Sequence, residues 1–248
     1  MKTFKSELLA SYQNIMHAYS TRTDGVSIYG NNLAYHVNDN KAHVDINHNT
    51  LATHLKYPLE HLVHMNQVHS DKIVIVDKTY NFNETPTCDA VITQVKETPL
   101  MVMVADCIPT LIYDPIKEVI AAVHAGRAGV FTKILPKTIK RMQEEYACNA
   151  KDILISFGPS IHQCCYQVGS EIKLEAEQLG YGYAIKTDND SYYLDLSSIA
   201  HQQLKSLGIQ DDNVESSSYC TACTTDIFYS YRAEKNNCGR FAGIIMLK

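Results

Sequence analysis

Two apolar segments near the middle of the chain end in side chains that can do chemistry. The segment "VIAAVHAGRAG", residues 119–129, reaches His124 and then small residues, and "LMVMVADCIP", residues 100–109, leads into Asp106 and Cys107. A thiolate and an imidazole can form a nucleophile and base pair, or they can be two ligands of a zinc ion. A buried cysteine beside a hydrogen-bonded histidine is a third interpretation, and it needs no ligand.

The residues that join these segments predict a β-hairpin that brings the two side chains together. In "TLIYDPIKEVIAAVH", residues 110–124, Pro115 suits an early position of the turn. Counting outward from that turn puts Cys107 opposite His124 or Ala125. Opposed residues of neighbouring strands have Cβ atoms about 4.5–5.5 Å apart, so one metal ion or one proton could contact both side chains.

A catalytic zinc site needs a third protein ligand, and the stretch "HLVHMNQVHSD", residues 61–71, offers three candidates. These are His61, His64 and His69, of which His69 lies just before a predicted strand. A histidine-rich polar stretch also fits a solvated surface, so the residues alone leave the choice open.

Other residues are candidates for anion binding. Gly126 and Gly129 predict a tight turn from strand to helix, where free backbone N–H groups could hold an anion, although turn geometry alone explains them as well. Arg232 and Arg240 lie near a late strand, and a guanidinium group can bind phosphate with two hydrogen bonds.

The remaining cysteines give a weaker signal. Cys220 and Cys223 form a lone CxxC pair, and Cys164 and Cys165 would complete a set of four. Nothing in the sequence fixes the distance between the two pairs. We therefore expect no metal there, and we expect Cys220 and Cys223 to be dispensable for activity.

The elements that must position these residues alternate between strands and helices. Short apolar runs separated by breakers predict strands of a largely buried sheet at residues 72–77, 90–93, 100–105, 110–114, 119–124, 153–159 and 241–247. Apolar stripes and caps predict helices over residues 134–146, 170–180 and 195–208. We expect Pro136 to kink or restart the first of these helices, Ser170 to cap the second, and Asp195 or Ser197 to cap the third. Residues 1–60 are polar and rich in Asn and His, and the whole chain is predicted to form one α/β domain over residues 1–248.

The composition is that of an ordinary globular protein. It has 45% hydrophobic and 20% charged residues, and its net charge of −5 gives no general attraction to nucleic acid or anionic lipid. The first residues do not form a secretory signal, and no segment approaches the roughly 20 apolar residues of a membrane-spanning helix. We expect a cytoplasmic protein whose eight cysteines are mostly reduced.

Seven sequence blocks, in order and at sensible spacing, resemble those of the YfiH-type, laccase-domain family, whose members also carry the name polyphenol oxidase. The blocks are "HAYSTRTDGVS", "NQVHSD", "CDAVIT", "MVADCIPTLIYD", "AAVHAGRAGV", "GPSIHQCCYQVGSEI" and "CTACTTDIFYSYRAEKNNCGRFAGIIML". The resemblance implies an α+β sandwich with mixed β-sheets flanked by helices. It also implies cleavage of purine nucleosides (adenosine, inosine, guanosine and methylthioadenosine) with phosphate, and deamination of adenosine as a side activity.

The same resemblance assigns the site residues. It implies a catalytic Zn²⁺ held by His69, Cys107 and His124, with Cys107 at the reacting centre. Asp89 and Asp106 are then expected to orient the zinc histidines, although either could instead serve near the purine base, which must leave protonated.

One block departs from the family pattern, because "HAGRAG" stands where the family has "HAGWRG". The tryptophan is missing, and Arg127 takes its place one position before the usual arginine. We expect Arg127 and Arg232 to bind the substrate phosphate.

Two other functions remain open from the residues. Cys107 and His124 could hydrolyse an amide, such as a cell-wall peptide precursor. The oxidase interpretation would need copper, and one His-Cys-His set holds too few metal ions for a laccase.

Overall fold

The strands of the computed structural model, which describes residues 1–235 and 237–248, form three sheets. The five-stranded sheet has the order β1 (Thr3–Phe4), β2 (Ile15–Ser20), β14 (Phe241–Leu247), β6 (Leu100–Val104) and β3 (Val63–His64). The six-stranded sheet has the order β13 (Val214–Ser216), β9 (Leu154–Phe157), β7 (Ile108–Asp114), β8 (Val119–Ala125), β5 (Ala90–Thr93) and β4 (Ile73–Ile75). The three-stranded sheet has the order β10 (Gln167–Val168), β12 (Ser191–Leu194) and β11 (Ile185–Asp188).

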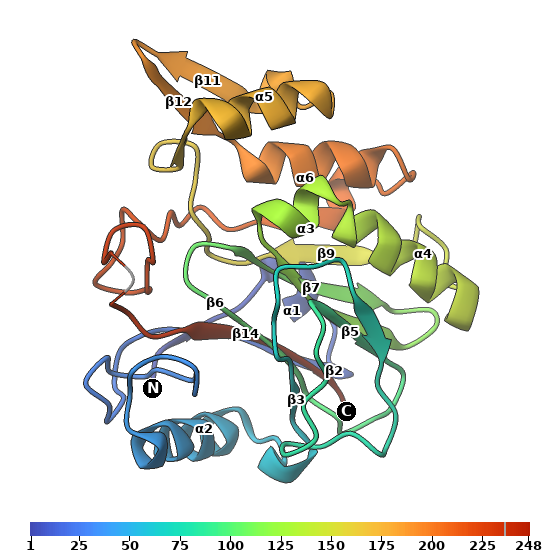
Figure 1. Cartoon of the computed structure of the whole chain (residues 1–248). Coiled ribbons are helices and arrows are strands. Elements are labelled where there is room, and N and C mark those ends of the chain that lie inside the picture. The colour runs from blue at the N-terminus through green and yellow to red at the C-terminus, as the bar shows by residue number, and fades with distance from the viewer. Residues whose placement is uncertain (236) are drawn as a thin grey trace.

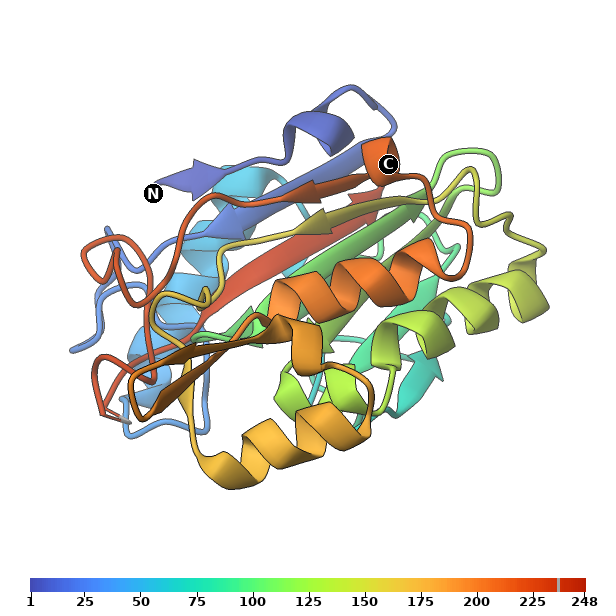
Figure 2. The same cartoon turned by 90° about the horizontal axis from the view of Figure 1, so that it is seen from above.

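The two larger sheets pack face to face, and helices cover their outer faces (Figures 1 and 2). The helices are α1 (Glu7–Ala10), α2 (Lys41–Leu55), α3 (Arg127–Phe131), α4 (Ile134–Tyr146), α5 (Ser170–Gln178) and α6 (Leu196–Lys205). Helices α3, α4 and α6 cover the six-stranded sheet, whereas α2 covers the five-stranded sheet on the opposite side of the molecule. Both sheets contain parallel and antiparallel pairs. The predicted α+β sandwich with mixed sheets is confirmed.

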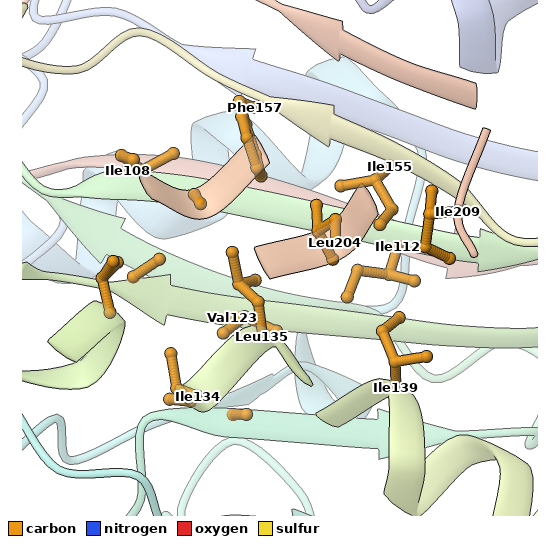
Figure 3. Close-up of a cluster of buried hydrophobic side chains, with 14 of the residues drawn as sticks. Ile108, Ile112, Val123, Ile134, Leu135, Ile139, Ile155, Phe157, Leu204 and Ile209 are labelled. Carbon is orange, nitrogen blue, oxygen red and sulfur yellow. The ribbon is translucent and has the colours of Figure 1, made fainter. Parts of the chain in front are cut away.

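Strand β8 shows why the predicted strands are unbroken runs of apolar residues and do not alternate with polar ones. Its side chains alternate between the core under the helices, which Val123 enters, and the core between the two sheets, which Ile120 and Ala122 enter. All seven residues of β8 are buried. A strand that is buried on both faces has no polar alternation, and this explains the run "VIAAVHA". Figure 3 shows the core between the six-stranded sheet and its helices.

The β7–β8 hairpin forms as predicted, but its register differs from the prediction. Ile108 pairs with Ala125, so Cys107, which lies just before β7, falls opposite Gly126. The prediction of His124 or Ala125 as its opposite residue is therefore wrong by one position or two.

The turn of the hairpin explains the difference. Asp114 pairs with Val119, which leaves a four-residue loop between the strands. The carboxylate of Asp114 accepts hydrogen bonds from the backbone N–H groups of Ile116 and Lys117, each at 2.9 Å. This side-chain turn sets the loop length, and a count of apolar residues does not reveal it.

The helices follow the predictions with two exceptions at their starts. Pro136 causes no break in α4, because it is the third residue of the helix, where the backbone N–H has no partner within the helix. Gly169, not Ser170, is the N-cap of α5. Asp195 caps α6 as predicted, with its carboxylate 2.9 Å from the N–H of Ser198.

Helix α2 was not predicted, because its buried face is not purely apolar. Val44 and Leu51 are buried together with Asn47 and His48, so the apolar periodicity is interrupted. Asn47 donates to the carbonyls of Gly30 and Asn32, and His48 bonds to the carbonyl of Leu33. No helix in the described part of the chain is long and apolar enough to cross a membrane.

The hairpin provides a matched test of the core. Ile112 is fully buried in β7, whereas Ile116 in the adjoining turn is 68% exposed. Ile112→Ala should lower the free energy of unfolding by about 2–5 kcal/mol, because the change removes buried methyl groups and leaves a cavity. Ile116→Ala should change it by less than about 0.5 kcal/mol. Equilibrium urea denaturation measures both, and equal effects would contradict the burial of Ile112 and the exposure of Ile116.

Candidate metal centre and pocket

Three side chains from separate parts of the chain meet at one end of the six-stranded sheet. They are His69, in the loop before β4, Cys107, just before β7, and His124, at the end of β8. One donor atom from each lies within 4.8 Å of the other two. The rings of His69 and His124 meet edge to face with centroids 4.7 Å apart. This group of two imidazoles and one thiol could hold a metal ion.

Gly126 is needed beside this group for space, not for its own backbone freedom. A Cβ atom at this position would lie 3.0 Å from Cys107 Sγ, 3.4 Å from His69 Cδ2 and 3.6 Å from His124 Cε1. The backbone of Gly126 itself is extended, with φ −77°, which any residue adopts. In the sequence, turn geometry explained Gly126 as well as anion binding did. The structure shows a further reason for glycine here, which is its close approach to all three side chains.

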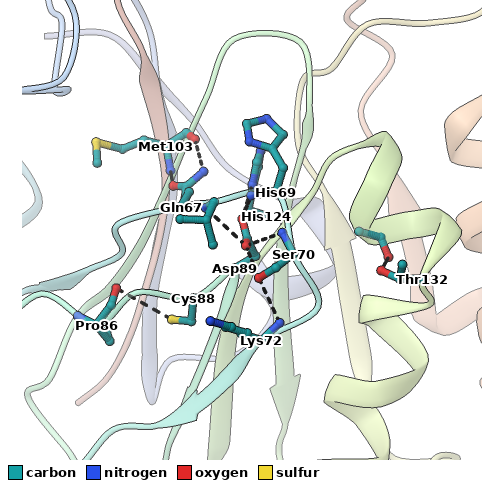
Figure 4. Close-up of polar contacts among 12 residues, drawn as sticks. Gln67, His69, Ser70, Lys72, Pro86, Cys88, Asp89, Met103, His124 and Thr132 are labelled. Carbon is teal, nitrogen blue, oxygen red and sulfur yellow. Dashed lines mark hydrogen bonds and ion pairs between the residues drawn. The ribbon is translucent and has the colours of Figure 1, made fainter.

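Asp89 holds the two histidines in place. Its carboxylate accepts a bond from His124 Nδ1 at 2.8 Å, so the Nε2 atom of His124 faces the other two side chains. It also accepts the backbone N–H groups of His69 at 3.0 Å and Ser70 at 2.7 Å, and the Ser70 hydroxyl at 2.8 Å (Figure 4). Asp89 therefore has the orienting role that the sequence predicted for it.

The sheet register places Asp89 beside His124. Strands β5 and β8 are antiparallel with Ala90 opposite Val123, so Asp89 is the next residue outward and faces His124. Their backbones are also bonded, with His124 N donating to the Asp89 carbonyl at 2.7 Å. His69 has a left-handed backbone, with φ 57°, which turns the chain so that its N–H reaches the carboxylate.

The charges in this group favour a thiolate. Burial alone raises the pKa of the Cys107 thiol, but His124 and His69 outweigh it and lower the pKa to about 6. Burial likewise lowers the pKa of His124, whereas the Cys107 thiolate and Asp89 raise it to about 9. Bonds from His124 and Ser70 bring the pKa of Asp89 down to about 2 against the opposing effect of burial. A thiolate is the form of cysteine that binds metals and attacks substrates.

The other two candidate histidines lie elsewhere. His61 is near the carbonyl of Glu97, on the surface. His64 is buried in β3 and packs against His48 and Phe82. Neither belongs to the group that contains His69.

A pocket of about 440 Å³ opens over the three side chains. Three arginines line it in a protein whose net charge is negative: Arg127, Arg232 and Arg240. Arg22 is not among the lining residues and pairs with Glu234 at 2.9 Å. The pocket therefore combines a metal-ligand group with positive charge suited to an anion.

Two of these arginines are held in position by the pocket wall. Arg127 forms an ion pair with Glu175 at 2.9 Å, and it is partly exposed. Arg232 donates from Nη1 to the carbonyl of Gln167 at 2.6 Å and lies over the ring of Tyr166. Both retain further N–H groups that can face a ligand.

Asp106 does not orient a histidine, so that part of the prediction is wrong. Its carboxylate accepts the hydroxyls of Thr221 and Ser230, each at 2.7 Å, and the backbone N–H of Arg232 at 2.7 Å. Its backbone is left-handed, with φ 92°. Asp106 directly precedes Cys107, so its hydrogen bonds tie the segment that carries Cys107 to the loops that form the pocket wall.

The sequence did not single out several other pocket residues. His36, Gln67, Tyr166 and Tyr231 all line the pocket. The Gln67 side chain bonds to both the backbone N–H and the carbonyl of Met103, at 2.9 and 2.8 Å. For Gln67 and Tyr231 the only indication in the sequence was their position next to candidate site residues. Gln67 lies two residues before His69, and Tyr231 lies beside Arg232.

The four remaining candidate cysteines also meet. The sulfurs of Cys164, Cys165, Cys220 and Cys223 all lie within 4.8 Å of one another, away from the first group. The sequence did not fix the distance between the two cysteine pairs, and we expected no metal there. The structure does not match this expectation, because it brings all four sulfurs together in a group that could hold a metal ion.

A family model described as "Multi-copper polyphenol oxidoreductase laccase" matches residues 16–248. The chain belongs to this laccase-domain family. The resemblance inferred from the seven sequence blocks is therefore confirmed.

Relatives within the laccase-domain family carry a second kind of name. The chain is 34% identical over 216 residues to purine nucleoside phosphorylase SCO2081 of Streptomyces coelicolor, covering 87% of each protein. It is 28% identical to purine nucleoside phosphorylase YlmD of Bacillus subtilis, covering 95% of this chain and 90% of that protein. Its fold matches the crystal structure of YfiH from Bacillus licheniformis with a TM-score of 0.89, at 28% identity and over 94% of this chain and 93% of that one.

The Asp89 contacts give a test of the metal centre of this laccase-domain protein. Asp89→Asn should weaken the binding of one zinc equivalent by about 10- to 100-fold, because it removes the charge that orients His124. Competition with a chromophoric chelator measures this affinity. Asp77→Asn is the control, because Asp77 is on the surface and its carboxylate accepts bonds from Thr79, away from the metal centre. An unchanged zinc affinity in Asp89→Asn would show that the carboxylate does not support the metal.

Proposed function

We propose that this protein is a zinc-dependent purine nucleoside phosphorylase, acting on adenosine, inosine, guanosine and methylthioadenosine with phosphate. The observation that carries the proposal is the pocket in which a His-Cys-His group lies next to three arginines. The names of the relatives support the same reaction class.

The donor set fits zinc. His69, Cys107 and His124 offer two imidazole nitrogens and one thiolate, which are ligands that Zn²⁺ prefers. Asp89 fixes the ring of His124 through the nitrogen that does not face the group, as in many zinc sites. His69, Cys107 and His124 would hold the ion, which would supply Lewis-acid chemistry to a group bound beside it in the pocket.

The reaction requires that phosphate and nucleoside meet in one pocket. A phosphate oxygen forms a bond to C1′ of the ribose, while the bond from C1′ to the purine nitrogen breaks and its electron pair leaves with the purine. The purine takes up the proton that the attacking hydrogen phosphate loses, so the products are a free base and ribose 1-phosphate.

Arg127 and Arg232 would bind the phosphate and hold it for attack. Both line the pocket, and guanidinium groups bind phosphate oxygens through charged hydrogen bonds. The pocket volume of about 440 Å³ falls within the range of small-molecule sites. Asp106 accepts three hydrogen bonds from the wall, so its role is to position Arg232 and not to transfer a proton.

Copper oxidase chemistry fits the donors less well. Within residues 1–235 and 237–248, the groups of three or more metal-binding side chains are this one and the four-cysteine cluster. A laccase holds several copper ions with many histidines, and the pocket supplies three, His36, His69 and His124.

A second candidate function is hydrolysis of an amide by Cys107. The observation that favours it is the position of Cys107 beside His124 in the pocket, where His124 and His69 lower the pKa of the thiol. A thiolate beside an imidazolium is also the resting state of cysteine hydrolases.

Product analysis with zinc-loaded protein tests the proposal. Inosine should give hypoxanthine and ribose 1-phosphate, and only when phosphate is present. Mass spectrometry distinguishes ribose 1-phosphate from the free ribose that hydrolysis would give. We also propose the adenosine deaminase side activity that the family resemblance implies, and a parallel reaction with adenosine tests it through the release of inosine and ammonia. Cleavage that does not depend on phosphate, or no cleavage of any of the four nucleosides, would overturn the phosphorylase proposal.

Arg127→Ala should raise the KM for phosphate by about 10- to 100-fold, because a charged hydrogen bond contributes about 1.5–3 kcal/mol. Zinc content should not change, since Arg127 is not a ligand. Arg141→Ala is the control, because Arg141 lies on α4 and pairs with Glu145 on the surface. If Arg127→Ala leaves the KM for phosphate unchanged, the anion is bound by Arg232 or Arg240 instead.

A further inference from the structure

Two loops that are far apart in the sequence bring four cysteine sulfurs together outside the pocket. Cys164 and Cys165 lie between β9 and β10, and Cys220 and Cys223 lie between β13 and β14. The loops pair directly, because Ser160 and Cys220 form an isolated parallel bridge.

The spacing of the sulfurs suits a single ion. The distances from Cys164 Sγ are 3.6 Å to Cys165, 3.7 Å to Cys220 and 3.8 Å to Cys223. Cys165 and Cys223 are 3.3 Å apart. Four sulfurs placed tetrahedrally at the usual Zn–S distance of about 2.3 Å are roughly 3.8 Å from one another. The thiols therefore already stand at nearly the separations that one zinc ion requires.

We propose that Cys164, Cys165, Cys220 and Cys223 form a second metal site, which holds one zinc ion through four thiolates. All four cysteines are free in the structure, so each can offer its sulfur. The backbone N–H of His162 points to Cys220 Sγ at 3.4 Å, and such a bond stabilises a thiolate.

The donors and their spacing fit a single zinc ion. Tetrahedral sets of four thiolates hold zinc or iron–sulfur clusters. In a cluster the thiolates are spread over two or more irons, so some of them lie far apart, whereas all four sulfurs here lie within 4.8 Å of one another. Four thiolates this close repel one another, and a divalent cation offsets that repulsion.

With four protein ligands the site has no open position, so its role is structural. The ion would join residues 160–167 to residues 219–224, and both loops contact Asp106. Ile161 N donates to the Asp106 carbonyl at 2.8 Å, and Thr221 Oγ1 donates to its carboxylate at 2.7 Å. The first loop also supplies Ile161 and Tyr166 to the pocket wall. The second zinc would thus fix the wall beside Cys107, whatever reaction the pocket catalyses.

Metal analysis of variants separates the two sites. The protein purified with zinc and a reductant should contain two zinc ions per chain. His69→Ala combined with His124→Ala should retain one, and Cys220→Ser combined with Cys223→Ser should also retain one. Cys148→Ala is the control, because Cys148 belongs to neither group and its loss should leave both ions bound. The proposal would be overturned if the wild-type protein contained one zinc ion per chain and the two histidine changes removed it.

A second measurement keeps the test valid if the cysteine variant does not fold. The His69→Ala, His124→Ala protein still has all four cluster cysteines, and cobalt(II) should bind to it with the intense sulfur-to-cobalt absorption of a tetrahedral tetrathiolate. A chelator should also lower its melting temperature. Absence of this absorption in the reduced protein, or a disulfide within the cluster that persists in excess zinc and reductant, would show that the cysteines are not a metal site.

Discussion

The buried carboxylate of Asp89 is the interaction on which the candidate metal centre depends. A charge with no exposed surface is very costly unless hydrogen bonds satisfy it, and Asp89 meets this condition only when His124, His69 and Ser70 all lie in place. The cost of leaving it unsatisfied therefore couples the end of β8 to the loop before β4. The two imidazoles reach the same point because a single acidic group binds the ring of one and the backbone of the other.

Asp106 does for the pocket wall what Asp89 does for the metal ligands. It directly precedes Cys107 and bonds to the loops that carry Ile161, Thr221 and Arg232, so the thiol and the wall share one support. The left-handed backbone at Asp106 is tolerated because these bonds fix it from several sides. Asp89 therefore supports the side chains that would bind zinc, and Asp106 supports the pocket wall that would contact the substrate.

The sequence predicted what depends on local pattern and missed what depends on distant contacts. Strands such as β8 were recognised because burial on both faces makes them wholly apolar. Helix α2 was missed because buried Asn47 and His48 bond to loop carbonyls and break its pattern. His69 was chosen over its neighbours only through family resemblance, since its distinguishing contact is with Asp89, twenty residues later. The meeting of Cys220 with the earlier cysteines depends on the pairing of two loops, which no spacing in the sequence reveals.

The position of β14 has a consequence for the way the chain is made. This strand lies in the middle of the five-stranded sheet, between β2 and β6, yet it is formed by residues 241–247. During synthesis, β2 and β6 emerge from the ribosome long before their common neighbour, and each exposes an unpaired edge until then. The two halves of that sheet cannot join before β14 emerges, so nearly the whole chain must wait on the ribosome in an incomplete state. The open edges of β2 and β6 are therefore the places where the nascent protein is most exposed to pairing with another chain.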